Sequence, residues 1–125
     1  DILMVKDRVS MSDHQLVIVP ELYIGQPVNL AAILTMTYSV ILELIQEQTT
    51  VRLLYWSMNR YEYEDVRVDY KEELDAVFAR MYYEKAYKNP SEAADHMALV
   101  HPEMHAYLHV FSDGQGAQMQ VRENE

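Results

Sequence analysis

VNLAAILTMTYSVILELIQEQ, residues 28–48, is the stretch on which the fold class depends. Six large aliphatic residues recur there at the three- and four-residue spacing of one helix face: Leu30, Ile33, Leu34, Ile41, Leu44 and Ile45. Between Thr35 and Val40, however, polar and larger apolar residues alternate with the period of two that is typical of a strand. The length of the segment and its aliphatic flanks favour a buried helix, so we predict one helix over residues 28–48.

Two runs of β-favouring residues precede this helix. Residues 2–9 and 15–24 predict a hairpin, with a turn at residues 10–13. Pro20 lacks a backbone N–H, so we expect either an edge strand or a break in the strand after it. Residues 1–10 could be an N-terminal extension, because Met11-Ser12-Asp13 reads naturally as a translation start.

The residues after the helix predict two further hairpins and a helix pair. Residues 51–57 and 61–69 suit strands around a turn at 58–60, and a slip in the apolar parity suggests a bulge near Glu64-Asp65. Residues 70–88 predict an amphipathic helix, with Asp69 and Glu72 at capping-box spacing. Ser91 can cap a second helix that reaches about residue 100. Residues 104–111 and 117–122 predict the last hairpin, across a turn at 112–116.

This order of elements predicts an α+β fold with a mainly antiparallel sheet built from hairpins and two to three helices packed on one face. The chain has 125 residues, half of them apolar, and contains no internal repeat or linker. We therefore expect a single domain over residues 1–125, with a frayed tail at 123–125.

The charge and the cysteine count restrict the classes of function. Twenty acidic residues stand against 10 basic ones, and the net charge of -10 disfavours direct nucleic-acid binding. A basic protein, including one that itself binds nucleic acid, fits such a surface better. The chain has no cysteine, which excludes disulfides and thiolate chemistry and suits a reducing, cytoplasmic setting. The uncharged stretch 22–42 holds too many polar residues for us to expect a membrane span.

Four of the five histidines lie between His96 and His109. On a helix, the four-residue spacing would put three of them on one face, where they could bind zinc or another divalent transition metal: His101, His105 and His109. In a strand, His105 and His109 would lie roughly 13 Å apart, beyond the reach of one metal ion. A His-dependent metal-binding protein is thus an alternative that requires residues 102–111 to be helical.

An acidic, tyrosine-rich segment supplies the leading hypothesis. Seven acidic residues occur between Glu62 and Asp75, against only Arg67 and Lys71. Tyrosine is enriched at interfaces because it buries a large ring at a small cost in rotamer entropy. We expect a non-catalytic interaction domain, which could be a self-associating assembly subunit or an inhibitor or adaptor that docks a basic partner. The expected partner-binding residues are Glu62, Glu64, Asp65, Tyr61, Tyr63 and Tyr83. The alternative is that these acids are only solvated and these tyrosines form ordinary cross-strand pairs.

Motifs for enzyme chemistry are missing from the sequence. It has no P-loop, no dinucleotide-binding glycine pattern, no nucleophile elbow and no zincin motif, so we predict no cofactor. A histidine and a carboxylate can still meet in space, which leaves a small-ligand or acid/base enzyme with a pocket between helices and sheet as a further alternative. The candidates for that chemistry are His14, His101 or His105 with Glu103 or Asp95.

Overall fold

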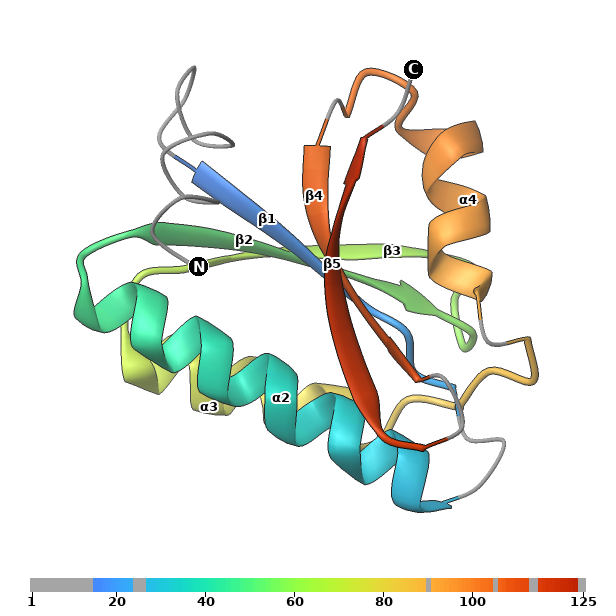
Figure 1. Cartoon of the computed structure of the whole chain (residues 1–125), viewed down its shortest axis with the longest axis horizontal. Helices are drawn as coiled ribbons and strands as arrows, with labels where there is room; N and C mark the ends of the chain where they lie inside the picture. Colours follow the sequence, from blue (N-terminus) through green and yellow to red (C-terminus); the bar gives the residue numbers. More distant parts are fainter. Residues whose placement is uncertain (1–14, 24–26, 90, 105, 113–114, 124–125) are drawn as a thin grey trace.

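The computed structural model describes residues 15–23, 27–89, 91–104, 106–112 and 115–123. Its elements follow the chain in the order β1 (Gln15–Pro20), α2 (Pro27–Gln46), β2 (Thr50–Ser57), β3 (Glu62–Val68), α3 (Lys71–Met81), α4 (Glu92–Val100), β4 (Ala106–Ser112) and β5 (Ala117–Glu123). The five strands form one mixed sheet in the order β3-β2-β1-β4-β5 (Figure 1). The predicted α+β class is confirmed.

Two antiparallel hairpins flank a central strand. β2 pairs with β3 and β4 pairs with β5, as predicted, whereas β1 runs parallel to both β2 and β4. The suggestion that Pro20 marks an edge strand is wrong. Pro20 is the last residue of β1 and lies opposite Val110, so its missing N–H falls where the strand breaks. Residues 2–9, the other half of the predicted first hairpin, and the predicted extension 1–10 lie outside the described residues.

Helix α2 confirms the helix predicted over residues 28–48. Its inner face is fully buried at Ile33, Thr37, Ile41 and Leu44. Thr37 is the polar member of that face, and its Oγ1 donates a hydrogen bond of 2.7 Å to the Ile33 carbonyl one turn earlier. The helix backbone therefore supplies a hydrogen-bond acceptor for the Thr37 hydroxyl. Thr37 is one of the polar residues whose alternation with apolar residues resembled a strand. Within the described residues, Asn29–Gln46 is long and apolar enough to cross a membrane, with a mean hydropathy of 1.4, but its inner face packs on the sheet as in a core helix.

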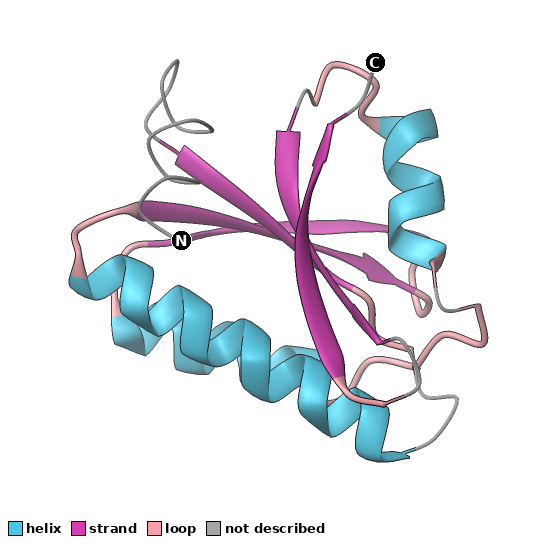
Figure 2. Ribbon diagram, in the orientation of Figure 1, coloured by secondary structure: helices cyan, strands magenta, loops and turns pink. Residues whose placement is uncertain are grey.

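The helices cover both faces of the sheet (Figure 2). α2 contacts β1, β2, β4 and β5, and α3 contacts β3 and α2, so these two helices share one face as predicted. α4 lies on the opposite face, against β1 and β2. Neighbouring residues of β2 show the alternation, since Tyr55 interacts with Arg80 of α3 whereas Trp56 stacks on His96 of α4.

The bulge predicted near Glu64-Asp65 is absent. The β2–β3 register runs without interruption from the Val51–Val68 pair to the Ser57–Glu62 pair. The apolar residues of this segment change from odd to even positions because both faces of β3 are covered. Tyr63 points toward α4, and Val66, on the other face, packs with the core beside α2 and α3.

Helix α3 ends at Met81, seven residues before the predicted end. The chain turns away because Tyr87 is needed in the core: its N–H donates to the Leu22 carbonyl at 2.7 Å, and its hydroxyl donates to the Trp56 carbonyl at 2.6 Å. At the start of α3, Glu73 takes the capping role predicted for Glu72 and accepts the Tyr70 N–H at 3.1 Å. The hairpin predicted near the C-terminus is confirmed as β4 and β5, and β5 includes Glu123, the first residue of the predicted frayed tail.

Candidate functional site

The β2–β3 turn, residues 58–61, meets the segment after α3, residues 82–84, at one end of the sheet. Ser57 joins them: its Oγ donates to Glu84 Oε1 at 2.8 Å and accepts the Arg60 N–H at 3.2 Å. Helix α4, at the right of Figure 1, reaches the turn through His96, whose ring lies near those of Trp56 and Tyr61. We call this region the aromatic corner, and its residues are Trp56, Tyr61, Tyr82, Tyr83, Glu84 and His96.

Tyr61 has an unusual backbone at this corner. Its φ of 57° lies in the left-handed region, which non-glycine residues seldom adopt. The side chain is 67% exposed, yet its ring centroid lies 5.5 Å from that of Trp56 and 6.1 Å from that of His96. Trp56 is buried and stacked on His96 at 3.8 Å. Two packed rings therefore support an exposed tyrosine.

A cleft adjoins the corner. It has a volume of about 210 Å³ and lies between α2 and residues 81–86. Its lining residues are apolar apart from Tyr82 and Glu84, and Glu84 is the charged one: Leu22, Leu30, Ala31, Leu34, Met81, Tyr82, Glu84 and Ala86. An apolar cleft with one carboxylate suits the aliphatic stem and charged end of a lysine or arginine.

The predicted partner-binding residues divide between two environments. Tyr61, Glu62 and Tyr83 are exposed, and Tyr83 reaches 87% exposure. Glu64 pairs with Arg60 at 3.2 Å, and Asp65 forms a bidentate ion pair with Arg52.

Tyr63 makes its contacts within the fold. Its hydroxyl donates to the Ala93 carbonyl of α4, and burial raises the pKa of that hydroxyl. Its ring also lies against Trp56 and His101. Tyr63 therefore positions α4, and Tyr61 is the aromatic residue that the turn presents to solvent.

A buried polar cluster lies at the other side of α4's first turn, and the sequence did not reveal it. Glu21 is fully buried and accepts hydrogen bonds from the N–H groups of Ala93 at 2.7 Å and Ala94 at 3.1 Å. Its Oε2 also lies 3.0 Å from Nε2 of His109. Arg122 Nε donates to His109 Nδ1 at 3.2 Å, so Nε2 carries the proton that His109 shares with Glu21.

This cluster replaces the predicted cap of α4. Ser91 occupies the N-cap position but makes no side-chain capping bond, whereas Glu21 caps the helix from 72 residues away in the chain. A carboxylate at this place also complements the positive end of the helix dipole. Glu21 and His109 are 0% and 1% exposed, so the cluster holds α4 on the sheet and offers no route to a substrate.

The metal-binding hypothesis required residues 102–111 to be helical, and this requirement is not met. Residues 106–112 form strand β4, and His109 is buried within it. His101 follows α4, and its Nδ1 lies 3.0 Å from Glu103 Oε1. In the part of the chain that the structure describes, no group of three metal-ligating side chains comes together. His105 lies outside that part, so the three-histidine site itself stays a prediction.

A groove and a pocket elsewhere on the molecule lack the histidine that the acid/base hypothesis requires. A groove of about 590 Å³ runs between α2 and β5, and a pocket of about 450 Å³ lies among Ile45, Gln48, Thr49, Arg67, Asp69 and Tyr70. Neither these two nor the cleft at the corner is lined by a histidine. His14, the remaining histidine candidate, lies outside the described residues.

Comparisons of this chain with protein-family models, with curated proteins and with solved structures found no match. Its function is therefore inferred from its own geometry.

Proposed function

We propose that this chain is a non-catalytic interaction domain whose aromatic corner docks a basic segment of a partner protein. The observation that carries the proposal is Tyr61, which is held at a φ of 57° with its ring exposed above Trp56 and His96. A left-handed backbone costs a side-chain-bearing residue about 1–2 kcal/mol, and such strain is concentrated at functional sites. Glycine or asparagine would suit this turn better, so the tyrosine is there for its ring.

The chemistry of the corner fits a cationic partner. Tyrosine is a frequent hot spot, and the face of an exposed tyrosine ring such as that of Tyr61 attracts arginine and lysine. Negative charge is also present, since the exposed Glu62 follows Tyr61 in the chain and Glu84 accepts the hydroxyl of Ser57, the residue after Trp56. A net charge of -10 would also steer a basic partner toward the chain.

An inhibitor or adaptor fits this corner better than an assembly subunit does. Two copies of this corner would bring like charges together, which is unfavourable. A basic partner instead gains attraction from the same charges.

The proposal is tested by capture from the native source with three baits: the unchanged chain, Tyr61→Asn and Tyr70→Asn. Tyr70 is a matched control, because it is 68% exposed and lies at the start of α3, beyond the opposite end of β3 from the turn. We expect the unchanged chain and Tyr70→Asn to retain the same basic protein in stoichiometric amount. Tyr61→Asn should bind it about tenfold more weakly, as for a hot-spot residue. Equal retention by Tyr61→Asn would overturn the proposal.

A further inference from the structure

The cleft beside the aromatic corner is connected to the β2–β3 turn through Ser57. The Ser57 carbonyl accepts the Tyr61 N–H at 2.7 Å, and the Ser57 hydroxyl donates to Glu84 Oε1 at 2.8 Å. Tyr61 is exposed at the turn, and Glu84 is the charged residue in the lining of the cleft. A partner segment that binds at the Tyr61 ring is therefore within reach of the cleft.

The lining of the cleft is mostly aliphatic and comes from three parts of the chain. Leu30 and Leu34 belong to α2. Met81 is the last residue of α3, and Leu22 lies just after β1. The volume of about 210 Å³ is smaller than the ~300–1,000 Å³ that is typical of sites for whole small molecules. The cleft therefore has the size for a single long side chain of a partner.

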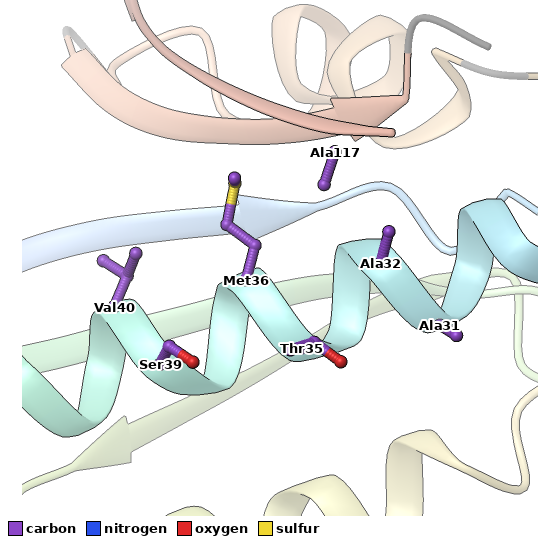
Figure 3. A pocket seen from close by; sticks show the side chains of 7 residues that line it. All are labelled: Ala31, Ala32, Thr35, Met36, Ser39, Val40 and Ala117. Carbon is purple, nitrogen blue, oxygen red and sulfur yellow. The ribbon is translucent and has the colours of Figure 1, made fainter. Parts of the chain in front are cut away.

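Glu84 gives the cleft a preference for positive charge. Its Oε1 accepts the Ser57 hydroxyl, and among the described residues Glu84 forms no ion pair. Arg80, four residues before Glu84, interacts with Tyr55. The larger groove between α2 and β5, drawn in Figure 3, shares Ala31 with the cleft but is lined by no charged residue, so it has no such preference. A carboxylate beside apolar walls attracts a cation more strongly than it would in open water.

We propose that the cleft receives one lysine side chain of the basic segment that docks at the aromatic corner, an inference that rests on the proposed function. The methylene stem of the lysine lies along the aliphatic lining, and its ammonium group meets Oε2 of Glu84. Arginine fits less well, because a guanidinium recognises a carboxylate through both oxygens and Ser57 already occupies Oε1. An ammonium group is a compact point charge that needs one oxygen.

The lysine side chain can be tested without the partner, with n-butylammonium as the probe. It should shift the NMR signals of the Ala31 and Ala86 methyl groups, which line the cleft, in a saturable way. Ala76 of α3 lies outside the lining, and its methyl signal should not move. The arginine counterpart, n-propylguanidinium, should bind several-fold more weakly, and n-butanol should give no saturable shift.

Two variants separate the charge of the cleft from the charge of the chain. Glu84→Gln keeps an acceptor for the Ser57 hydroxyl but removes the charge, so it should abolish the saturable shift with unchanged circular dichroism. Glu43→Gln makes the same change at an exposed position of α2 outside the cleft and should bind n-butylammonium like the unchanged chain. Equal shifts with n-butanol, or no shift with n-butylammonium, would overturn the inference.

The captured basic protein provides the second test. It should bind Glu84→Gln about tenfold more weakly than the unchanged chain or Glu43→Gln. Acetylation of its lysines removes their charge and leaves its arginines unchanged, so it should weaken binding to the unchanged chain more than binding to Glu84→Gln. Equal losses for the two chains would show that no lysine meets Glu84.

Failure of this inference can be distinguished from failure of the proposed function. Capture that is weakened by Tyr61→Asn but not by Glu84→Gln would keep the docking corner and overturn the lysine in the cleft. Equal capture by Tyr61→Asn would overturn the docking corner itself. The n-butylammonium titration needs no partner, so it would then still show whether the cleft accepts a lysine side chain.

Discussion

At the scale of single residues, Tyr61 combines an unfavourable backbone conformation with an exposed aromatic ring. Its backbone occupies the left-handed region, where a β-carbon is unfavourable, while its ring touches Trp56 and His96. Local backbone preference and side-chain identity disagree at this position. This disagreement is the basis of the docking role that we propose for the exposed ring.

The backbone strain at Tyr61 predicts that glycine is more stabilising than alanine at this position, which is the reverse of the usual order. Both Tyr61→Gly and Tyr61→Ala remove the ring, but only glycine is relaxed at a φ of 57°. The glycine variant should therefore be more stable than the alanine variant by about 1 kcal/mol, measured by urea unfolding. Ala79 in α3 supplies the opposite control, because Ala79→Gly should lower the free energy of unfolding by about 1 kcal/mol. Equal stability of the two Tyr61 variants would show that the turn is unstrained.

Glu21 is the second residue with a specific prediction. Glu21→Gln keeps the shape of the side chain but removes the charge that accepts the Ala93, Ala94 and His109 donors. Loss of buried, charge-assisted hydrogen bonds should lower the free energy of unfolding by about 2 kcal/mol. Amide hydrogen exchange should accelerate first in α4, the helix that Glu21 caps. Glu43→Gln, an exposed change in α2, should have little effect on either measurement.

At the scale of elements, α2 and α3 are joined by hydrogen bonds to Asp75, and the stability that these bonds contribute depends on pH. The Tyr38 hydroxyl of α2 donates to Asp75 Oδ1 at 2.6 Å, and Lys71 Nζ donates to Asp75 Oδ2 at 2.8 Å. The hydrogen bonds from Lys71 and then Tyr38 hold the pKa of the Asp75 carboxyl below its usual range. A lowered pKa means that these bonds add stability above the unfolded pKa of about 4 and lose it as the pH falls further.

Asp75→Asn should therefore lower the Tm at pH 7 because it removes the ionised acceptor. The difference in Tm between the variant and the unchanged chain should close as the pH falls below about 4, since Asp75 is then protonated in both states of the unchanged chain. Thermal unfolding followed by circular dichroism at several pH values measures this difference. A difference that stays constant down to pH 2 would contradict the assignment.

The elements that could be predicted from the sequence are those with their own internal period. The helix expected over residues 28–48 is present as Pro27–Gln46, because its aliphatic spacing is a local property. The end of α3 and the cap of α4 could not be predicted, because Tyr87 binds Leu22 and Glu21 binds Ala93 across long chain separations. The one signal for Glu21 was an acid within an apolar run, residues 16–24. The parallel pairing of β1 likewise depends on how α2 crosses the sheet.

At the scale of the whole molecule, the proposed docking surface and a neutral groove adjoin along α2. The aromatic corner lies at the β2–β3 turn, and the groove reaches Ala117 of β5 at the other edge of the sheet, but Ala31 lines both the groove and the cleft beside the corner. The sequence suggested one acidic, tyrosine-rich surface for either kind of partner. In the structure, the exposed Tyr61 and Glu62 of the proposed partner-binding corner lie at the β2–β3 turn, whereas the groove is lined by no charged residue.

Salt should therefore weaken the interaction of the corner with a basic partner. Raising the ionic strength from about 0.05 M to about 0.5 M shortens the screening length several-fold and should slow association with the basic partner. Stopped-flow binding at the two ionic strengths measures this rate. An association rate that does not change with salt would contradict docking through charge.

Trp56 offers the most direct test of the aromatic corner. It is the single tryptophan of the chain, and it packs against both Tyr61 and His96. Its fluorescence should change and saturate at one partner per chain when the captured basic protein is titrated into the unchanged protein, and Tyr61→Asn should require about tenfold more partner. Binding that leaves the Trp56 emission unchanged, or that is equally tight with Tyr61→Asn, would contradict docking at this corner.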